Sequence, residues 1–331
     1  MNVPEWFEKY RFKASSFSNI KRLVELKNKQ KQVISLIIPT LNEADTIGKV
    51  ISVLKSNLMD KHGLIDEIIV MDSGSTDETL DIAKKHGVIA IAASEVLKKQ
   101  GDFRGKGENL WKALHVAKGT IVCWVDADIK NIHPRFVYGL VGPLLTNDKL
   151  KFVKPFYKRP IKIGDKLESL GGGRVTELLI RPLFNMYFPR LAGFIQPLSG
   201  EGAGRRTAFE KIPYFTGYGV ETAMLIDMRK KFGLRAMAQV DLLRRVHRNQ
   251  SLASLSRMAF AILGVFAKRA NTLGKLIHVG SIKTIYKIIT TDKESRYYLK
   301  HMKIIDKQRP PIITIPEYRR KFKKNPSWMA L

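Results

Sequence analysis

The sequence predicts an α/β protein with a mainly parallel, doubly wound sheet of the Rossmann-like type and a mostly helical C-terminal extension. Short apolar runs alternate with helical patterns between residues 33 and 125, an order that gives parallel strands joined by crossover helices. Polar clusters follow three of the apolar runs, where parallel sheets bind their ligands. From Ser251 onward the patterns are mainly helical until Pro310 and Pro311.

Each expected element has its own signal. Residues 33–38 form a continuous apolar run before Pro39, which is typical of a strand buried on both faces. Ser75 and Glu78 have the spacing of a capping box at a helix start, and Gly87 follows an expected helix end. We therefore expect strands at 33–38, 67–71, 88–92 and 120–125, and helices at 44–58, 76–86 and 107–118.

The chain of 331 residues is long enough for one large α/β domain with an appendage, or for two modest domains. We expect a helical lead-in at 1–32, the main α/β domain at 33–250, and a helical region with a basic tail at 251–331. Cys123 is the single cysteine, so no intrachain disulfide can form. Because it lies in an apolar run, we expect it to be buried and inert.

The formal net charge of +28 fits three kinds of anionic partner: nucleic acid, a membrane surface, or a small molecule with several phosphates. The sequence has no zinc-finger spacing, no aromatic ribonucleoprotein motif and no heptads beside a basic region, so no nucleic acid is expected as the main partner. The longest apolar helical stretch, residues 258–266, is far shorter than the roughly 20 residues of a membrane span. Since no leader is visible either, we expect a cytoplasmic protein without membrane insertion.

Asp126 and Asp128 carry the clearest chemical signal. They follow the apolar run 120–125 and, because side chains alternate along an extended segment, both point to one side. Two neighbouring carboxylates repel each other unless a cation compensates them. A hard divalent ion such as Mg²⁺ or Mn²⁺ suits oxygen ligands and bridges to a diphosphate. A pair of solvated turn aspartates is the alternative to a metal site.

Three segments together resemble glycosyltransferases of the GT-A fold. In order, they are Ile38-Pro39-Thr40-Leu41-Asn42-Glu43, Asp72-Ser73-Gly74-Ser75-Thr76-Asp77 and Asp126-Ala127-Asp128. In that fold the first two segments hold the nucleoside, and the Asp-x-Asp element binds the metal on the donor diphosphate. The resemblance therefore implies a GT-A fold and a nucleotide-sugar donor.

Four further segments are similar to those of the glucosyl-3-phosphoglycerate synthase family, and the likeness spans about residues 33–249. They are Gly105–Glu108, Gly171–Glu177, Gly217–Glu221 and Arg245–Asn249. The family implies a divalent metal, Mg²⁺ or Mn²⁺, bound by Asp128 and His247. It also implies a donor site formed by Pro39, Thr40, Leu41, Asn42, Glu43, Ser73, Lys106, Asp126, Ala127, Tyr218, Gly219, Val220, Glu221, Arg245 and Arg248. The acceptor, 3-phosphoglycerate, would be bound by Gly173, Arg174, Val175, Thr176 and Asn249.

Without the family, the same positions allow simpler interpretations. The glycines before Arg174 expose N–H groups suited to phosphate or carboxylate, but such a run is also typical of a flexible hinge. Glu221 could be only a favourable charge at a helix start, and His247 an ordinary histidine in a basic loop. The loop at 199–202 is expected near the donor and has no assigned role.

The resemblance implies retaining transfer of glucose from a nucleotide diphosphate donor to the 2-hydroxyl of D-3-phosphoglycerate by a homodimer. The product, glucosyl-3-phosphoglycerate, belongs to glucosylglycerate biosynthesis. The metal and Lys106 would stabilise the leaving diphosphate, Arg174 would orient the acceptor, and Glu221 is the third candidate for a catalytic role. The alternatives are a transferase of another hexose such as mannose, one acting on a phosphorylated lipid, a nucleotidyltransferase, and a basic nucleic-acid-binding protein.

Overall fold

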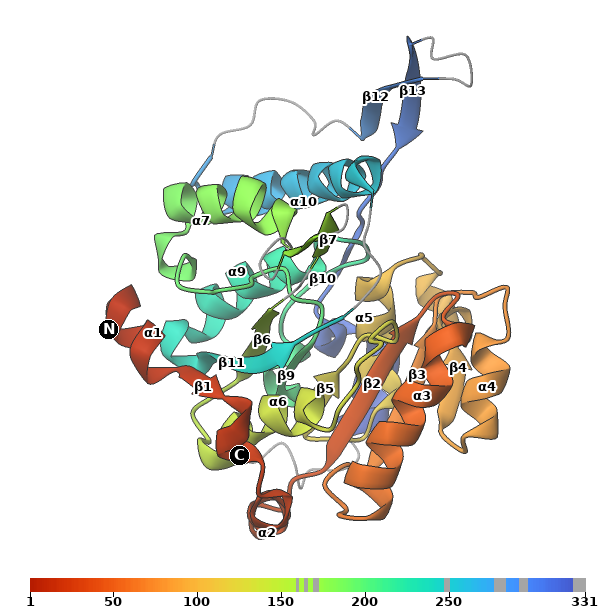
Figure 1. Cartoon of the computed structure of the whole chain (residues 1–331), viewed down its shortest axis with the longest axis vertical. Coiled ribbons are helices and arrows are strands. Elements are labelled where there is room, and N and C mark those ends of the chain that lie inside the picture. The colour runs from red at the N-terminus through yellow and green to blue at the C-terminus, as the bar shows by residue number, and fades with distance from the viewer. Residues whose placement is uncertain are drawn as a thin grey trace.

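The computed structural model describes residues 1–158, 161–163, 166–168, 173–246, 251–276, 284–291 and 297–323. At its centre lies an eight-stranded sheet, in which one strand is antiparallel to both of its neighbours and all other pairs are parallel (Figure 1). The antiparallel strand is β9 (Gly202–Arg205). The sheet order is β1 (Arg11–Lys13), β11 (Met237–Arg244), β6 (Phe152–Lys158), β9, β5 (Ile121–Trp124), β2 (Ile34–Thr40), β3 (Glu67–Asp72) and β4 (Ile89–Ala92). The expected α/β class is confirmed.

Helices cover both faces of this sheet (Figure 1). One face carries α2 (Ile20–Lys29), α3 (Ala44–Leu54) and α6 (Arg135–Thr146), and the other carries α5 (Lys106–Val116) and α9 (Val220–Phe232). The residues of β2 alternate between two apolar cores, because Leu36 and Ile38 belong to the first and Ile37 to the second. The sheet is therefore doubly wound, as the continuous apolar run at 33–38 predicted.

One expected helix start is wrong. α4 (Thr79–Lys85) has Glu78 as its N-cap and no side-chain cap, so Ser75 and Glu78 form no capping box. The Ser75 hydroxyl donates to the Asp72 carboxylate at 2.5 Å and accepts the Asn42 N–H at 2.8 Å. Because these partners occupy the hydroxyl, Ser75 caps no helix. It instead joins the two loops that follow the carboxyl ends of β2 and β3.

The C-terminal region leaves the main domain and then returns to it. α10 (Leu252–Thr272) packs beside α9, and the hairpin of β12 (Ile285–Thr291) and β13 (Tyr297–Lys303) projects from the body of the molecule (Figure 1). After the hairpin, β14 (Gln308–Arg309) pairs with β10 (Tyr214–Phe215), and α11 (Pro316–Lys323) follows. The region thus contains the expected helices and also strands. Its boundary at 250/251, like that at 32/33, remains a prediction.

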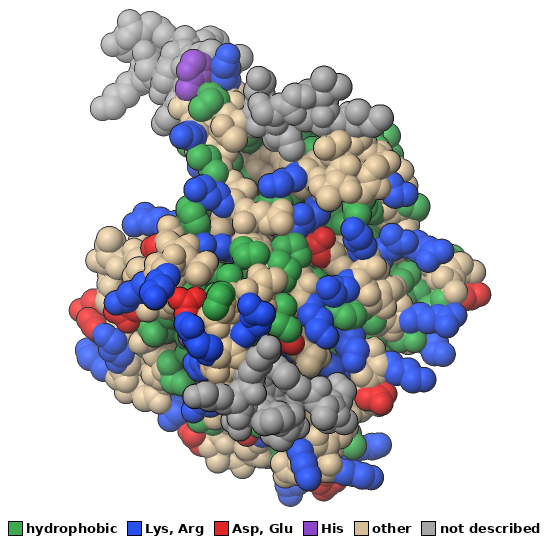
Figure 2. Space-filling model, turned by 180° about the vertical axis from the view of Figure 1, so that it is seen from behind, with side chains coloured by type: hydrophobic (Ala, Val, Ile, Leu, Met, Phe, Trp, Pro, Cys, Tyr) green, Lys and Arg blue, Asp and Glu red, His purple; other side chains and the backbone are tan. Residues whose placement is uncertain are grey.

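The other elements are short. They are α1 (Val3–Lys9), α7 (Arg181–Tyr187), α8 (Arg206–Phe209), β7 (Ile161–Ile163), β8 (Lys166–Glu168), and 3₁₀ or π segments at Ala14–Phe17, Lys55–Asp60, Ala93–Glu95, Lys98–Gln100, Thr176–Ile180, Pro189–Leu191, Leu234–Ala236 and Ile312–Thr314. Cys123 is buried in β5, as expected. In the described part of the chain, none of the helices combines the length and apolar character needed to cross a bilayer. Figure 2 shows Lys and Arg side chains spread widely over one face of the molecule.

Candidate active site

A cavity of about 650 Å³ opens at the carboxyl ends of β2, β3 and β5. It brings together most of the predicted site, namely Pro39, Thr40, Leu41, Glu43, Ser73, Lys106, Asp126, Ala127, Asp128, Gly173, Arg174, Val175, Thr176, Tyr218, Glu221 and Arg245. α10 and the segment 303–306 also contribute to its wall. Residues that are far apart in the sequence therefore face one space, large enough for a nucleotide-sugar.

The remaining predicted residues lie elsewhere or outside the described chain. Asn42 is not among the described residues that line the cavity, and its side-chain oxygen accepts the Thr76 N–H at 2.8 Å. Gly219 and Val220 form the start of α9 and do not line the described cavity wall either. The other three, His247, Arg248 and Asn249, fall outside the described residues. The ligand contacts of all six remain predictions.

Buried hydrogen bonds fix the loops that follow β2 and β3. The Asp72 carboxylate accepts the Thr40 hydroxyl at 3.0 Å and the Gly74 N–H at 2.9 Å. The Ser73 hydroxyl donates to the side-chain oxygen of Asn109, a buried residue of α5, at 2.9 Å. Thr40 and Ser73 are thus held at the cavity edge, where the nucleoside is expected. Sequence reasoning missed Asn109, which also lines the cavity.

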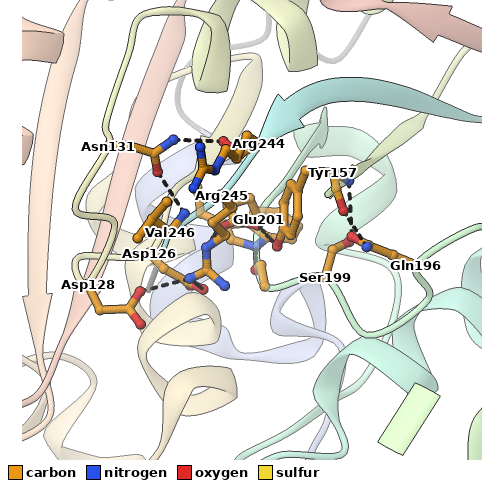
Figure 3. A network of polar contacts seen from close by, with 12 residues as sticks. Asp126, Asp128, Asn131, Tyr157, Gln196, Ser199, Glu201, Arg244, Arg245 and Val246 are labelled. Carbon is orange, nitrogen blue, oxygen red and sulfur yellow. Dashed lines mark hydrogen bonds and ion pairs between the residues drawn. The ribbon is translucent and has the colours of Figure 1, made fainter. Parts of the chain in front are cut away.

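Asp126 and Asp128 face the same side, as predicted, and Arg245 bridges them (Figure 3). Its Nη2 atom lies 2.8 Å from Asp126 Oδ2 and 2.8 Å from Asp128 Oδ1, and its Nε atom lies 3.0 Å from Glu201 Oε1. Burial alone would lower the pKa of Arg245, but these carboxylates and Tyr157 raise it well above its ordinary value. A permanently charged arginine therefore compensates the repulsion between the two aspartates.

Glu201 is a functional candidate to which the sequence assigned no role. Its carboxylate is fully buried and accepts the Tyr157 hydroxyl at 2.7 Å (Figure 3). Lys154, also buried, donates to the backbone carbonyls of Ser199 and, at 3.5 Å, Glu201. Burial lowers the pKa of Lys154 to about 8, although Glu221 and Glu201 favour its charged form. The only signal in the sequence was one acidic residue in a glycine-containing loop.

Lys106 lies among three carboxylates, those of Asp126, Glu201 and Glu221. Its ammonium group is paired with Asp126, lies 3.5 Å from Glu221 Oε1 and donates to the Gly200 carbonyl at 2.5 Å. Burial disfavours this charge, but Asp126, Glu221 and Glu201 together raise the pKa of Lys106. Burial likewise raises the pKa of Glu221, with Lys106 opposing the rise. Lys106 thus stays cationic beside the position expected for the donor phosphates.

The residues present fit a hard divalent ion. Asp126 and Asp128 offer oxygen ligands at the cavity, and the Asp128 side chain keeps 28% of its surface exposed. No group of three His, Cys, Asp or Glu side chains forms a complete metal site among the described residues. The predicted third ligand, His247, lies outside them. A nucleotide diphosphate would supply further oxygens.

The expected acceptor segment lies in the same cavity. Gly173 has a φ of 97°, in the left-handed region that favours glycine. The Glu177 N–H donates to the Gly173 carbonyl at 3.0 Å, an α-type bond that closes the turn before the π segment at Thr176–Ile180. Arg174, Val175 and Thr176 line the cavity between these points. The turn thus presents one cation and one hydroxyl to a ligand.

Several residues that line the cavity were not among the site residues predicted from the sequence. They are Arg104, Gly105, Asn109, Leu198, Gly200, Gly217, Leu255, Met258, Ala261, Ile262, Lys303, Ile304, Ile305 and Asp306. Those of α10 and of the segment 303–306 come from the C-terminal region, where no recognisable motif marks them.

Comparison with known proteins decides the family. Residues 35–211 match the family model described as glycosyl transferase family 2. The chain is 53% identical over 313 residues to the glucosyl-3-phosphoglycerate synthase of Petrotoga mobilis, covering 95% of this chain and 96% of that protein. The chain belongs to the glucosyl-3-phosphoglycerate synthase family. It is also 45% identical to the synthase of Mycolicibacterium paratuberculosis, over 73% of both chains.

Solved structures agree with this membership. The glucosyl-3-phosphoglycerate synthase of Mycobacterium tuberculosis, solved with Mn²⁺, UDP and glucosyl-3-phosphoglycerate, has a TM-score of 0.78 and 37% identity, covering 90% of this chain and 96% of that one. The mannosyl-3-phosphoglycerate synthase of Rubrobacter xylanophilus has a TM-score of 0.87 and 38% identity, covering 94% and 99%. The expected GT-A fold and glycosyltransferase class are confirmed.

Proposed function

We propose that the chain transfers glucose from UDP-glucose to the 2-hydroxyl of D-3-phosphoglycerate, with retention at the anomeric carbon. The observation that carries the proposal is one cavity holding the Asp126–Asp128 pair, Lys106 and the Gly173–Thr176 turn. The family supports the reaction, since the M. tuberculosis relative was solved with Mn²⁺ and UDP-glucose and, separately, with phosphoglyceric acid. The proposed reaction also accounts for part of the net charge of +28, because a positive field attracts both anionic substrates.

The main catalytic requirement of this reaction is to stabilise the negative charge that develops on the leaving diphosphate. Asp128 and the predicted His247 would hold Mg²⁺ or Mn²⁺, which would neutralise the diphosphate when bound. Lys106 acts beside it as a fixed cation, since three carboxylates keep its ammonium group charged. Fixed charges of this kind need no reorganisation as the bond breaks.

The acceptor is oriented by the Gly173–Thr176 turn, which lines the same cavity. Arg174 supplies a planar fork for phosphate or carboxylate oxygens, and Gly173 and Thr176 supply backbone and hydroxyl groups. The acceptor oxygen bonds to the anomeric carbon on the face from which the diphosphate leaves, and the hydroxyl proton passes to that leaving diphosphate. Glu221 receives a hydrogen bond from a sugar or acceptor hydroxyl and is not assigned as a nucleophile.

Mannose is the second candidate sugar, because the mannosyl-3-phosphoglycerate synthase of R. xylanophilus covers nearly the whole chain. The test is to incubate the purified protein with Mn²⁺, 3-phosphoglycerate and, one at a time, UDP-glucose, ADP-glucose, GDP-glucose and GDP-mannose. We expect release of UDP and a product whose proton NMR spectrum is that of an α-glucoside. Turnover of GDP-mannose alone would replace glucose by mannose in the proposal.

The acceptor and the assembly are tested in the same preparation. A phosphorylated lipid offered in place of 3-phosphoglycerate should not be glycosylated. We further propose a cytoplasmic homodimer, following the expectation from the family; light scattering after gel filtration should give twice the monomer mass of this 331-residue chain. A monomeric mass with full activity would contradict the dimer and leave the reaction unaffected.

A further inference from the structure

The segment that returns from the β12–β13 hairpin runs along the loop that precedes α9. The Thr216 N–H donates to the Lys307 carbonyl at 2.9 Å, and the Lys307 N–H donates to the Thr216 hydroxyl at 3.2 Å. Immediately beyond, β14 pairs with β10. This pairing places Asp306 against the loop at 216–219, in the wall of the cavity.

Both carboxylate oxygens of Asp306 are bound to this loop. Oδ1 accepts the Gly217 N–H at 2.7 Å, and Oδ2 accepts the Gly219 N–H at 3.0 Å. Gly219 is the N-cap of α9 and offers no side chain of its own. Asp306 therefore supplies, from a distant part of the chain, a charged acceptor at this helix start, where a negative charge is also favoured by the helix dipole.

The other side of the loop is held by the start of α5. A Cβ atom at Gly107 would lie 1.7 Å from the Phe215 carbonyl oxygen, and one at Gly105 would lie 2.4 Å from the Thr216 carbonyl oxygen. In addition, the Glu108 N–H donates to the Thr216 carbonyl at 3.2 Å. The loop is thus clamped between Asp306 and the two glycines that flank Lys106.

Two cavity residues depend on this clamp. Tyr218 lies between the two N–H groups that Asp306 binds. Glu221 follows three residues after Tyr218, with its Oε1 atom 3.5 Å from the Lys106 ammonium group. A shift of the loop would move both relative to Lys106 and the donor. We propose that Asp306 is a positioning residue for transfer, which fixes Tyr218 and Glu221 against the donor sugar. This inference rests on the proposed function, which places the donor beside these residues.

The test compares Asp306→Asn with Asp227→Asn. Asparagine keeps the size of Asp306 but turns an NH₂ group toward one of the two N–H donors. Asp227 is the control, because it lies on α9, the helix whose start Asp306 binds, and pairs with Arg269 at 2.8 Å, outside the described cavity lining. For both variants we would measure kcat and both KM values, and amide hydrogen exchange of residues 216–220 without substrate.

We expect Asp306→Asn to lower kcat about 10- to 100-fold with KM values within about threefold, because small misplacements near reacting groups are costly. Exchange of 216–220 should accelerate in this variant only. Asp306→Glu, which retains the carboxylate, should keep more of kcat and also covers the case that Asp306→Asn does not fold.

Three results would overturn the inference: an unchanged kcat, unchanged exchange at 216–220, or a rise in one KM alone, which would make Asp306 a direct substrate contact. An equal loss of kcat in Asp227→Asn would show that general destabilisation explains the effect of Asp306→Asn, and would also overturn the inference. If the wild-type protein transferred no sugar at all, the proposed function would fail first, while the exchange data would still decide whether Asp306 holds the loop.

Discussion

Arg245 lies 3.0 Å from the buried carboxylate of Glu201, and the far end of its guanidinium reaches the two aspartates of the predicted metal site. Arg245 is 4% exposed and Glu201 is fully buried, so this ion pair is withdrawn from bulk water, whereas the side chains of Asp126 and Asp128 stay 20% and 28% exposed. Removing one partner from a buried ion pair leaves a charge without compensation. The geometry at the predicted metal site therefore depends on Glu201, in a loop with no recognisable motif.

Replacing Glu201 by glutamine should destabilise the protein and disturb the metal site together. The neutral amide keeps the shape but removes the charge that holds Arg245, and we expect a loss of about 2–4 kcal/mol in the free energy of unfolding. Arg245 would then pair with Asp126 and Asp128 alone and compete with the metal for them. UDP binding in the presence of Mn²⁺, measured by calorimetry, should weaken.

Tyr157→Phe is the control for this variant. It removes only the neutral hydroxyl that donates to Glu201 at 2.7 Å, at a cost of about 1.5–3 kcal/mol for a hydrogen bond to a charged group. The charge on Glu201 and its pairing with Arg245 stay. If Tyr157→Phe weakened Mn²⁺-dependent UDP binding as much as Glu201→Gln does, the effect would come from packing and not from charge.

Asp128→Ala should abolish metal-dependent donor binding and leave the fold intact. Arg245 would keep Asp126 and Glu201 as partners, so no buried charge is left unpaired. We expect turnover to fall at least about 100-fold, since removal of one charge-stabilising group commonly costs that much. Asp81→Ala, at an exposed aspartate of α4 that is 3.9 Å from Lys84, is the matched control. Activity of Asp128→Ala within a few-fold of wild type would refute the metal assignment.

Lys154 should make stability depend on pH. Its pKa in the folded protein is about 8, mainly because of burial, against an ordinary value of 10.5. Between these two values the unfolded chain binds more protons than the folded one, so the free energy of unfolding should rise as pH increases from about 8 to 10.5. The contribution is on the order of 1–3 kcal/mol.

Urea unfolding at several pH values would measure this effect. Lys154→Met should flatten the rise between pH 8 and 10, whereas Lys149→Met, at an exposed lysine, should keep the wild-type slope. Equal slopes in wild type and Lys154→Met would show that Lys154 titrates as an ordinary lysine. The comparison of slopes avoids any constant offset that either substitution adds to stability.

The parts predicted from sequence share one property: their signals are local. β2 has a continuous apolar run because both of its faces are buried, and the polar segments at strand ends converge because parallel strands end at one edge. The start of α4 was misplaced because Ser75 bonds to Asn42, 33 residues away. The spacing of Ser75 and Glu78 does not reveal that Asn42 is the hydrogen-bond partner of Ser75.

The residues that sequence reasoning missed act through distant partners. Glu201 binds a hydroxyl 44 residues away, and Asp306 binds an N–H group 89 residues away. Each is a single acidic residue without a surrounding pattern, so only the folded chain shows what it touches. By contrast, Lys106 and Asp128 stand in motifs whose neighbours carry the signal.

Arg174→Ala should separate the two substrates. Gly173 adopts a left-handed φ of 97°, and the turn it begins brings Arg174 into the cavity that also holds Lys106 and Asp128. Loss of one charged, partly desolvated contact costs about 2–4 kcal/mol, or roughly 30- to 1000-fold in kcat/KM for 3-phosphoglycerate. UDP affinity, measured by calorimetry with Mn²⁺, should barely change, because the predicted nucleotide contacts come from other loops.

Two further variants complete this test. Arg174→Lys should recover only part of the loss, because it keeps the charge but not the planar fork that matches phosphate or carboxylate oxygens. Arg190→Ala, at an exposed arginine beyond α7, should behave as wild type. If Arg174→Ala instead lost UDP affinity while acceptor KM stayed constant, Arg174 would serve the donor diphosphate. That outcome would leave the family membership intact and remove the residue-level basis for placing 3-phosphoglycerate at the Gly173–Thr176 turn.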